Sequence, residues 1–236
     1  MNSEIYVKIN ELVVPIYTIP QDPPINHELA IQFVPFKNWI SNVDPQFNIS
    51  KIVFQSVDMF GPKIGFLKFQ VFGTFNGKQV PGVVFSRGNS VCILPVLICN
   101  NQKYVICCLQ PRMASGKIKC ELPAGMMDGD GNFIGVASKE MKEETGIEIK
   151  EHELLDLSNT LLYPSIGGCD EGIRFMLYKK NVTSEFLSDL NGKITGNFEE
   201  GEVIKLKIIK YENLHIECDD MKAMTSMLLV ERLNLI

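Results

Sequence analysis

The stretch GMMDGDGNFIGVASKEMKEETGI, residues 125–147, decides how the rest of the sequence is interpreted. Its first part is a glycine-rich loop, residues 133–145 have helical spacing, and the next glycine ends that segment. At about 100° per residue, Glu140, Glu143 and Glu144 fall within one arc of the expected helix, roughly 100° wide. The stretch therefore predicts a loop, a helix and three acidic side chains on one side of that helix.

Neighbouring carboxylates repel one another, and each raises the pKa of the others unless a cation lies among them. Hard divalent ions such as Mg²⁺ prefer oxygen ligands of this kind and keep waters and substrate phosphates as further ligands. The alternative is a solvated surface helix with i,i+4 Glu–Lys pairs. However, the acidic arc begins with the apolar Val136 and Ala137 one turn earlier. This continuity, together with the glycine-rich loop and the glycine stop, favours a metal site.

The stretch resembles the Nudix box, whose pattern is Gly-x5-Glu-x7-Arg-Glu-U-x-Glu-Glu-x-Gly-U, where U is apolar. The spacing matches throughout, and two positions depart from the pattern. Gly131 stands where the first Glu belongs, and Asp128 or Asp130 are candidates to supply the missing carboxylate. Lys139 stands where the Arg belongs, which keeps the charge but loses the bidentate fork.

The resemblance extends to the ADP-ribose/ADP-sugar pyrophosphatase branch of this family, and the plant-type ADP-sugar diphosphatases are the most similar group. It covers roughly residues 50–230 and rests on five segments besides the box. These segments are residues 56–68, 109–112, 121–125, 164–171 and 199–205.

The resemblance implies a metal centre at the box. Glu140 and Glu144 are then metal ligands together with the backbone carbonyl of Ala124, and Glu143 is a ligand or a neighbour of the ligands that takes part in catalysis. Mg²⁺ is the implied cofactor, with Mn²⁺ as a substitute.

The resemblance also implies roles outside the box. Arg112 and Glu121 match positions that contact the diphosphate and the terminal sugar. The general base of such relatives comes from a later loop, which matches residues 199–202 here. Glu200 and Glu202 are both candidates for the base, and the sequence does not choose between them. A solvated acidic loop is the alternative interpretation of this segment.

Two more residues are candidates for substrate binding. Arg87 precedes a glycine at the expected domain junction and could reach a phosphate, although a surface arginine is the plainer interpretation. Glu171 follows a Gly-Gly turn and could shape the substrate pocket, although a plain turn is equally consistent with the sequence.

The composition excludes several other classes of protein. A chain of 236 residues with 45% hydrophobic and 22% charged residues is long and apolar enough for a globular core. A net charge of −5 provides no basic face for nucleic acid. No run approaches the roughly 18 apolar residues that span a bilayer, and the N-terminus resembles neither a secretory signal nor a transit peptide, so we expect a cytoplasmic protein. The seven cysteines lack paired Cys-x-x-Cys spacing and predict reduced, buried thiols.

The first part of the chain predicts a small antiparallel β domain at residues 1–89. Strand-like runs at 52–57, 64–72 and 79–85 include an Asn-Gly hairpin signal at residues 76 and 77. Residues 1–26 resemble a loose arm or an extended strand, and 27–40 predict one short helix. In relatives with such a unit it commonly forms the dimer contact, so the resemblance implies a homodimer.

The second part, residues 90–236, predicts the Nudix hydrolase domain. A buried hairpin at 91–109 is followed by the box helix, by strands near 153–162, 173–179 and 202–209, and by a final helix at 219–233. Strands interrupted by few helices indicate an α/β (α+β) fold in which a mixed β-sheet is sandwiched between helices.

The resemblance implies metal-dependent hydrolysis of an ADP-sugar, either ADP-ribose or ADP-glucose, to AMP and a sugar phosphate. Two alternatives stay open. The first is the same reaction on a UDP-sugar such as UDP-glucose. The second is a module that binds a nucleotide sugar without hydrolysing it, which the departures at Gly131 and Lys139 keep in consideration.

Overall fold

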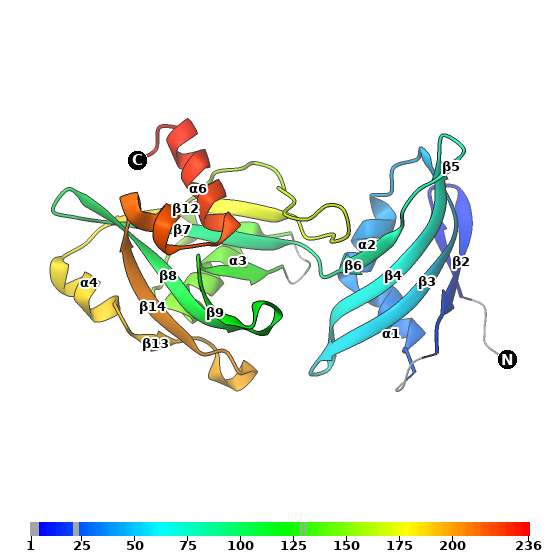
Figure 1. The fold of residues 1–236 in the computed structure, drawn as a ribbon, viewed down its shortest axis with the longest axis horizontal. Coiled ribbons are helices and arrows are strands. Elements are labelled where there is room, and N and C mark those ends of the chain that lie inside the picture. Colours follow the sequence, from blue (N-terminus) through cyan, green and yellow to red (C-terminus); the bar gives the residue numbers. More distant parts are fainter. Residues whose placement is uncertain (1–4, 21–23, 128, 130) are drawn as a thin grey trace. The chain divides into compact units, whose positions relative to one another are not determined.

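The computed structural model describes residues 5–20, 24–127, 129 and 131–236, apart from the side chain of Glu200. The chain forms two compact units (Figure 1). The first unit comprises the residues up to Asn89 together with Tyr163–Gly172. The second comprises Ser90–Leu162 and Ile173–Ile236.

The first unit is built on one mixed sheet with the strand order β1-β2-β3-β4-β5, and β6 pairs with β4. β2 and β3 pair in parallel, because helices α1 and α2 lie between them in sequence and form the crossover that a parallel pair requires. The other pairs of this sheet are antiparallel. The elements are β1 (Ile5–Ile9), β2 (Leu12–Thr18), α1 (His27–Gln32), α2 (Val34–Ser41), β3 (Phe47–Phe60), β4 (Lys63–Phe75), β5 (Lys78–Gln79) and β6 (Val83–Ser86).

Three predictions for this unit can be compared with the structure. The Asn-Gly hairpin is confirmed, with φ of 52° at Asn76 and 74° at Gly77. The loose arm or single strand is instead the hairpin of β1 and β2. The single helix at 27–40 is wrong, because the chain breaks at Phe33 and restarts with Pro35 in the first turn of α2, a position that proline tolerates.

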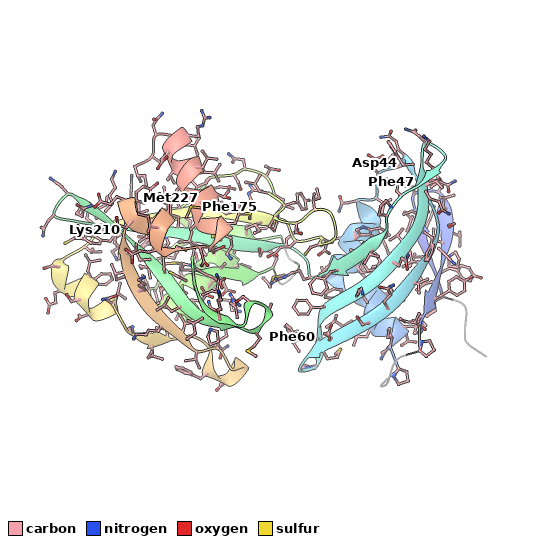
Figure 2. The ribbon with its side chains drawn as sticks, viewed as in Figure 1. Asp44, Phe47, Phe60, Phe175, Lys210 and Met227 are labelled. Atoms are coloured by element: carbon pink, nitrogen blue, oxygen red, sulfur yellow. The ribbon has the colours of Figure 1, made fainter. Side chains whose placement is uncertain are left out.

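An aromatic cluster forms the core of the first unit. Phe36 is fully buried and meets Phe54 and Phe69 edge to face, with ring centroids 5.1 and 5.2 Å away. Trp39 packs on Phe69 at 5.1 Å. Phe60, labelled in Figure 2, lies at the far end of the β3–β4 hairpin and is 60% exposed.

The second unit is built on a sheet with the strand order β11-β12-β7-β8-β14-β13. β10 pairs with β7 and β9 pairs with β8. Among the described strands of this sheet only the β12–β7 pair is parallel, so this sheet is also mixed. The strands are β7 (Ser90–Cys99), β8 (Gln102–Arg112), β9 (Lys117–Glu121), β10 (Ala124–Met126), β11 (Leu154–Asp156), β12 (Ile173–Asn181), β13 (Ile194–Thr195) and β14 (Ile204–Lys210).

Helices cover both faces of this sheet. The core on one face includes residues of α5 (Leu214–Glu217) and α6 (Met221–Arg232). Phe175 and Met227, labelled in Figure 2, belong to this core. The core on the other face includes residues of α3 (Phe133–Glu140) and α4 (Ser184–Leu190). The predicted α+β architecture, a mixed sheet sandwiched between helices, is confirmed.

In the second unit, the predicted strands agree best with the structure where the sequence contains a turn signal between them. The β7–β8 hairpin is confirmed, and Asn100 and Asn101 adopt φ of 50° and 61° in its turn. The final helix is α6. The strand predicted near 153–162 is reduced to β11 and an isolated bridge at Leu162. α4, β9 and β10 are short elements that the sequence pattern did not indicate.

Among the residues that the structure describes, no helix is both long and apolar enough to cross a bilayer.

Candidate active site

The box helix is an α-helix that ends in a wider turn. Asn132 caps α3 by accepting a hydrogen bond from the Gly135 N–H at 2.9 Å. A π-helical turn, Met141–Thr145, continues it to Gly146, whose φ is 74°. Such wide turns inside helices are rare and are frequent at functional sites. The prediction of one helix ending at this glycine is correct in extent, but its second half is not α-helical.

Glu144 lies in the π-helical turn and is almost completely buried, with 2% exposure. Its Oε2 accepts from the Ala124 N–H at 3.0 Å, and its Oε1 accepts from Nε2 of Gln110 at 3.2 Å. Burial, and then the nearby charge of Glu140, raises the pKa of Glu144 to about 8. A carboxyl group in this state gains by binding a cation, because the cation removes the repulsion that the burial intensifies.

Glu140 lies against the backbone of the glycine-rich loop. A Cβ built on Gly125 would lie 2.0 Å from Cδ and Oε1 of Glu140, so a larger residue at position 125 would displace this carboxylate from its present position. β10 carries Gly125 next to Ala124, the residue whose peptide N–H bonds Glu144. The loop and the helix therefore hold two carboxylates beside one short strand.

Glu143 has a different environment from its two neighbours in the box. Its carboxylate lies 3.7 Å from Nζ of Lys139, one turn earlier, and its side chain is 35% exposed. Its backbone carbonyl accepts from the Gly196 N–H at 3.2 Å. The Thr195 hydroxyl donates to the carbonyl of Glu144 in the same way. The end of the helix is thus attached to the segment that leads into the later acidic loop.

The acidic loop contributes Glu202 to the same region. Glu202 is half-buried, and its charge acts on both Glu144 and Arg112. Its N–H donates to the carbonyl of Asn197 at 2.9 Å across the turn. Glu200 ends the short 3₁₀ turn Phe198–Glu200, and its side chain lies outside the described residues, as do Asp128 and Asp130. We call Glu140, Glu144 and Glu202 the acidic cluster.

Arg112 and Glu121 form a bidentate pair at the ends of β8 and β9. Nε and Nη2 of Arg112 donate to the two carboxylate oxygens of Glu121 at 2.7 and 3.1 Å. Burial alone would raise the pKa of Glu121, but Arg112 and Lys222 hold it below its ordinary value. The pair with Glu121 raises the pKa of Arg112, and Glu144 and Glu202 add to this effect. The pair therefore lies within electrostatic range of the acidic cluster.

The structure places the two remaining candidates in the first unit. Nη1 of Arg87 lies 3.6 Å from the Glu171 carboxylate, and the Arg87 guanidinium lies over the ring of Phe66 at 5.8 Å. Next to them, Asp170 accepts hydrogen bonds from the Ser86 hydroxyl and from backbone N–H groups at 87 and 88. The side chains of Arg87 and Glu171 are thus partners of each other within this unit.

The acidic cluster is the set of residues whose donors suit a hard divalent ion. Its oxygen donors and its gathered negative charge are of the kind that Mg²⁺ prefers. Among the described residues, the three potential ligands whose donor atoms all lie within 4.8 Å of one another are the thiols of Cys107, Cys120 and Cys218 in the core, so the carboxylates of the acidic cluster are farther apart than these thiols. A structural zinc ion takes four ligands, and this set offers three.

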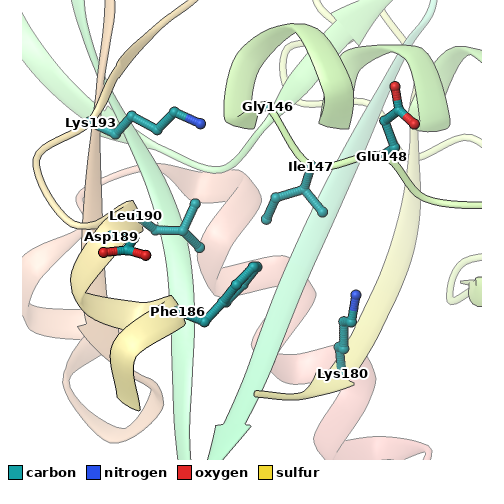
Figure 3. A pocket seen from close by; sticks show the side chains of 8 residues that line it. All are labelled: Gly146, Ile147, Glu148, Lys180, Phe186, Asp189, Leu190 and Lys193. Atoms are coloured by element: carbon teal, nitrogen blue, oxygen red, sulfur yellow. The ribbon is translucent and has the colours of Figure 1, made fainter. Parts of the chain in front are cut away.

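A pocket of about 450 Å³ lies elsewhere in the second unit (Figure 3). It begins at Gly146, beyond the end of the box helix, and α4 supplies Phe186 and Leu190. The ammonium groups of Lys180 and Lys193 point into it. None of its lining residues belongs to the acidic cluster or to the Arg112–Glu121 pair, so this hollow is distinct from the candidate site.

Two residues of the site were not predicted. Gln110 is a buried polar residue on β8, and strand alternation places it on the same face as Cys108 and Ile106, which belong to the core that includes α3. That alternation was a usable signal in the sequence. Thr195 bonds Glu144 across 51 positions in the chain, and no local pattern indicates such a contact.

Known proteins resemble this chain in sequence and in fold. A model of the NUDIX domain matches residues 90–226. The chain is 40% identical over 220 residues to Nudix hydrolase 14, chloroplastic, of Arabidopsis thaliana, an alignment covering 86% of this chain and 71% of that protein. A solved ADP compounds hydrolase shares the fold with a TM-score of 0.57 at 15% identity, covering 82% of this chain and 96% of the other. Because the matched domain includes the sheet, the glycine-rich loop and the carboxylate helix, the chain belongs to the Nudix hydrolase family.

Proposed function

We propose that this Nudix hydrolase cleaves ADP-sugars, namely ADP-ribose and ADP-glucose, to AMP and a sugar phosphate in a reaction that depends on a divalent metal. As a member of the family, the chain is a hydrolase of the diphosphate bond in nucleoside diphosphate derivatives. The ADP-sugar assignment rests on the sequence resemblance described above. The solved neighbour, an ADP compounds hydrolase, is consistent with it.

The observation that carries the proposal is the state of Glu144. A buried carboxylate with a pKa near 8 and two acidic neighbours is unfavourable in a protein that has no cation to bind there. Arg112 interacts electrostatically with Glu144 and Glu202, and its guanidinium could bind the negative diphosphate of a substrate. Acidic ligands beside a phosphate-binding cation are the arrangement that hydrolysis of a phosphoanhydride requires.

In this proposal, Glu140 and Glu144 hold Mg²⁺ with the carbonyl of Ala124, and Mn²⁺ is a substitute. Glu143 is a ligand or supports the ligands and takes part in catalysis. An ion bound by these ligands would supply positive charge to the diphosphate and would lower the pKa of a water molecule. Arg112 and Glu121 bind the diphosphate and the terminal sugar.

The general base that accepts the proton of the attacking water is Glu202 or Glu200. We favour Glu202, since it acts electrostatically on both Glu144 and Arg112. Substrate binding by Arg87 and Glu171 remains part of the proposal, and their ion pair would position both side chains.

Product analysis by chromatography tests the proposal. ADP-ribose, ADP-glucose and UDP-glucose are supplied in parallel, with Mg²⁺ or with a chelator. AMP formed from an ADP-sugar only with Mg²⁺ is the expected result, and UMP formed from UDP-glucose instead would assign a uracil preference. Folded protein that binds these compounds without cleaving them would favour a binding role. The variant Gly131→Glu would then test whether the missing carboxylate accounts for the lack of hydrolysis.

We also propose that the first unit forms a homodimer contact and that the protein acts in the cytoplasm. The β1–β2 hairpin lies at one edge of its sheet and exposes apolar side chains, including Val13 at 70% and Tyr17 at 48%. Sedimentation at several protein concentrations, with Val13→Asp as the test variant, checks the dimer. Imaging of the fluorescently tagged full chain checks the compartment.

A further inference from the structure

Lys222, on the C-terminal helix, is joined to the Arg112–Glu121 pair. Its Nζ donates to Oε2 of Glu121 at 3.4 Å, the oxygen that also accepts from Nη2 of Arg112. On its other side, Nζ lies 3.1 Å from Oδ2 of Asp220. Arg112, Glu121, Lys222 and Asp220 thus form a row of alternating charges, which we call the charge chain.

The place of Lys222 is unfavourable for a cation in two respects. It lies in the first turn of α6, where the helix dipole disfavours positive charge. Its side chain is also only 19% exposed, and burial disfavours the charged form. Nevertheless, the pKa of Lys222 is raised: burial alone would lower it, and Asp220 and Glu121 outweigh that effect. The contacts of Lys222 therefore compensate two costs that a solvent-exposed lysine would avoid.

The charge chain limits how Arg112 can turn. Glu121 occupies the Nε–Nη2 edge of the guanidinium, which directs the other N–H groups away from that carboxylate. Arg112 is otherwise half-exposed, with 45% of its side chain accessible, and a free arginine would lose much rotamer entropy on binding a ligand. Glu121 is held on its far side by Lys222, so the orientation of Arg112 is set in part from α6.

We propose that Lys222 is a positioning residue for substrate binding, which acts by fixing Glu121 and, through it, the guanidinium of Arg112. The inference rests on the proposed role of Arg112 in binding the diphosphate. Lys222 itself does not contact the substrate in this proposal. Its effect belongs to KM, because it orders a binding group before the substrate arrives.

A double-mutant cycle between Lys222→Met and Arg112→Ala tests the proposal. We expect Lys222→Met to raise KM for ADP-ribose about tenfold and to change kcat less than about threefold. In the Arg112→Ala background, the same replacement is expected to change KM less than about twofold. Lys222→Arg is expected to recover most of the lost affinity, since it restores the charge.

Binding measured by calorimetry with a methylene-bridged analogue of ADP-ribose gives the same cycle without turnover. Lys119→Met is the matched control, because Lys119 pairs with Asp219 near the start of α6 without contacting Glu121. If Lys222→Met does not fold, the double variant Lys222→Met/Asp220→Asn removes both charges and keeps the chain balanced.

The outcomes separate the two proposals. Hydrolysis by the wild-type protein, combined with independent effects of the two replacements or a loss confined to kcat, overturns the role of Lys222 alone. A wild-type protein that neither cleaves ADP-sugars nor binds the analogue overturns the proposed function, and the inference fails with it.

Discussion

The acidic cluster and the charge chain lie in the same unit and both bury charge, but their charges are arranged in opposite ways. In the acidic cluster, like charges are gathered, and the pKa of Glu144 rises to about 8 through burial and its acidic neighbours. In the charge chain, signs alternate, and the pKa of Glu121 stays below its ordinary value although the residue is buried. Arg112 belongs to the charge chain and lies within range of the cluster.

This difference in charge arrangement indicates that the charge chain has a structural role and that the acidic cluster has a role in binding. A row of alternating charges is neutralised by its own members without an added counter-ion, and its hydrogen bonds can hold the side chains in fixed positions. A group of like charges is destabilised by its own repulsion, so we expect the acidic cluster to gain stability when a cation binds to it. Substitutions and changes of pH can test whether the two regions differ in this way.

The largest effect is expected at the centre of the acidic cluster. Glu144→Gln removes a proposed metal ligand and should reduce Mg²⁺-dependent turnover by about three orders of magnitude. The fold should persist, because Gln resembles the protonated carboxyl group. Turnover assays and thermal unfolding check this, with Glu148→Gln as the control, since the Glu148 side chain is 75% exposed and lies on the other side of Gly146. Near-normal turnover of this variant would contradict the assignment of Glu144 as a metal ligand.

The acidic loop should show the next largest effect. We expect Glu202→Gln to lower kcat about 100-fold, the scale of general base catalysis, and Glu200→Gln to have a smaller effect. The pH dependence of kcat identifies the base, because loss of the group should remove the acid limb of the profile. The reverse ranking would assign the base to Glu200, and small effects for both would place it elsewhere.

Stability against pH should separate the two regions without any substrate. The pKa of Glu144 is 4.5 in the unfolded chain and about 8 in the folded protein, so the folded protein keeps this carboxyl group protonated up to about pH 8. The folded state therefore holds the extra proton in this range, and the free energy of unfolding of metal-free protein should fall as pH rises from about 5 to 8, by on the order of 3 kcal/mol. Denaturant titrations measure this slope. Glu144→Gln should flatten it, and an unchanged slope in that variant would contradict the assignment.

The smallest effect is expected at the outer end of the charge chain. Asp220→Asn leaves Lys222 paired with Glu121 and keeps a residue that caps helices well. The free energy of unfolding should fall by less than about 1 kcal/mol, and KM should change less than about threefold. Chemical denaturation and steady-state kinetics measure both quantities. A loss as large as that of Lys222→Met would mean that Asp220, rather than Glu121, is the essential partner of the lysine.

The two regions also differ in how far the sequence predicts them. The glycine-rich loop, the helix and its glycine stop are local signals, and the spacing of Glu140 and Glu144 follows from them. The hairpin turns at Asn76 and Asn100 are local in the same sense, since their positive φ suits Asn. These parts could be predicted because the residues that determine them are close together in the chain.

The charge chain could not be predicted from the sequence. Glu121 and Lys222 are 101 positions apart, and their contact depends on how α6 packs on the sheet. The π-helical turn was not indicated by the sequence pattern either, and the hydrogen bond from Thr195 to the Glu144 carbonyl in that turn is equally non-local. Pairings of short strands such as β9 and β10 depend on register in the same way.

The segment Tyr163–Gly172 limits where the chain can be cut or exchanged without damaging the first unit. It returns to the first unit, where the Phe85 N–H donates to the Gly168 carbonyl at 2.7 Å and Asp170 bonds Ser86. The polypeptide therefore passes from one unit to the other three times. A truncated gene that starts at residue 90, or a chimera that exchanges only residues 1–89, would separate Asp170 from its partners. Recombination, in the laboratory or in evolution, has to exchange both segments together.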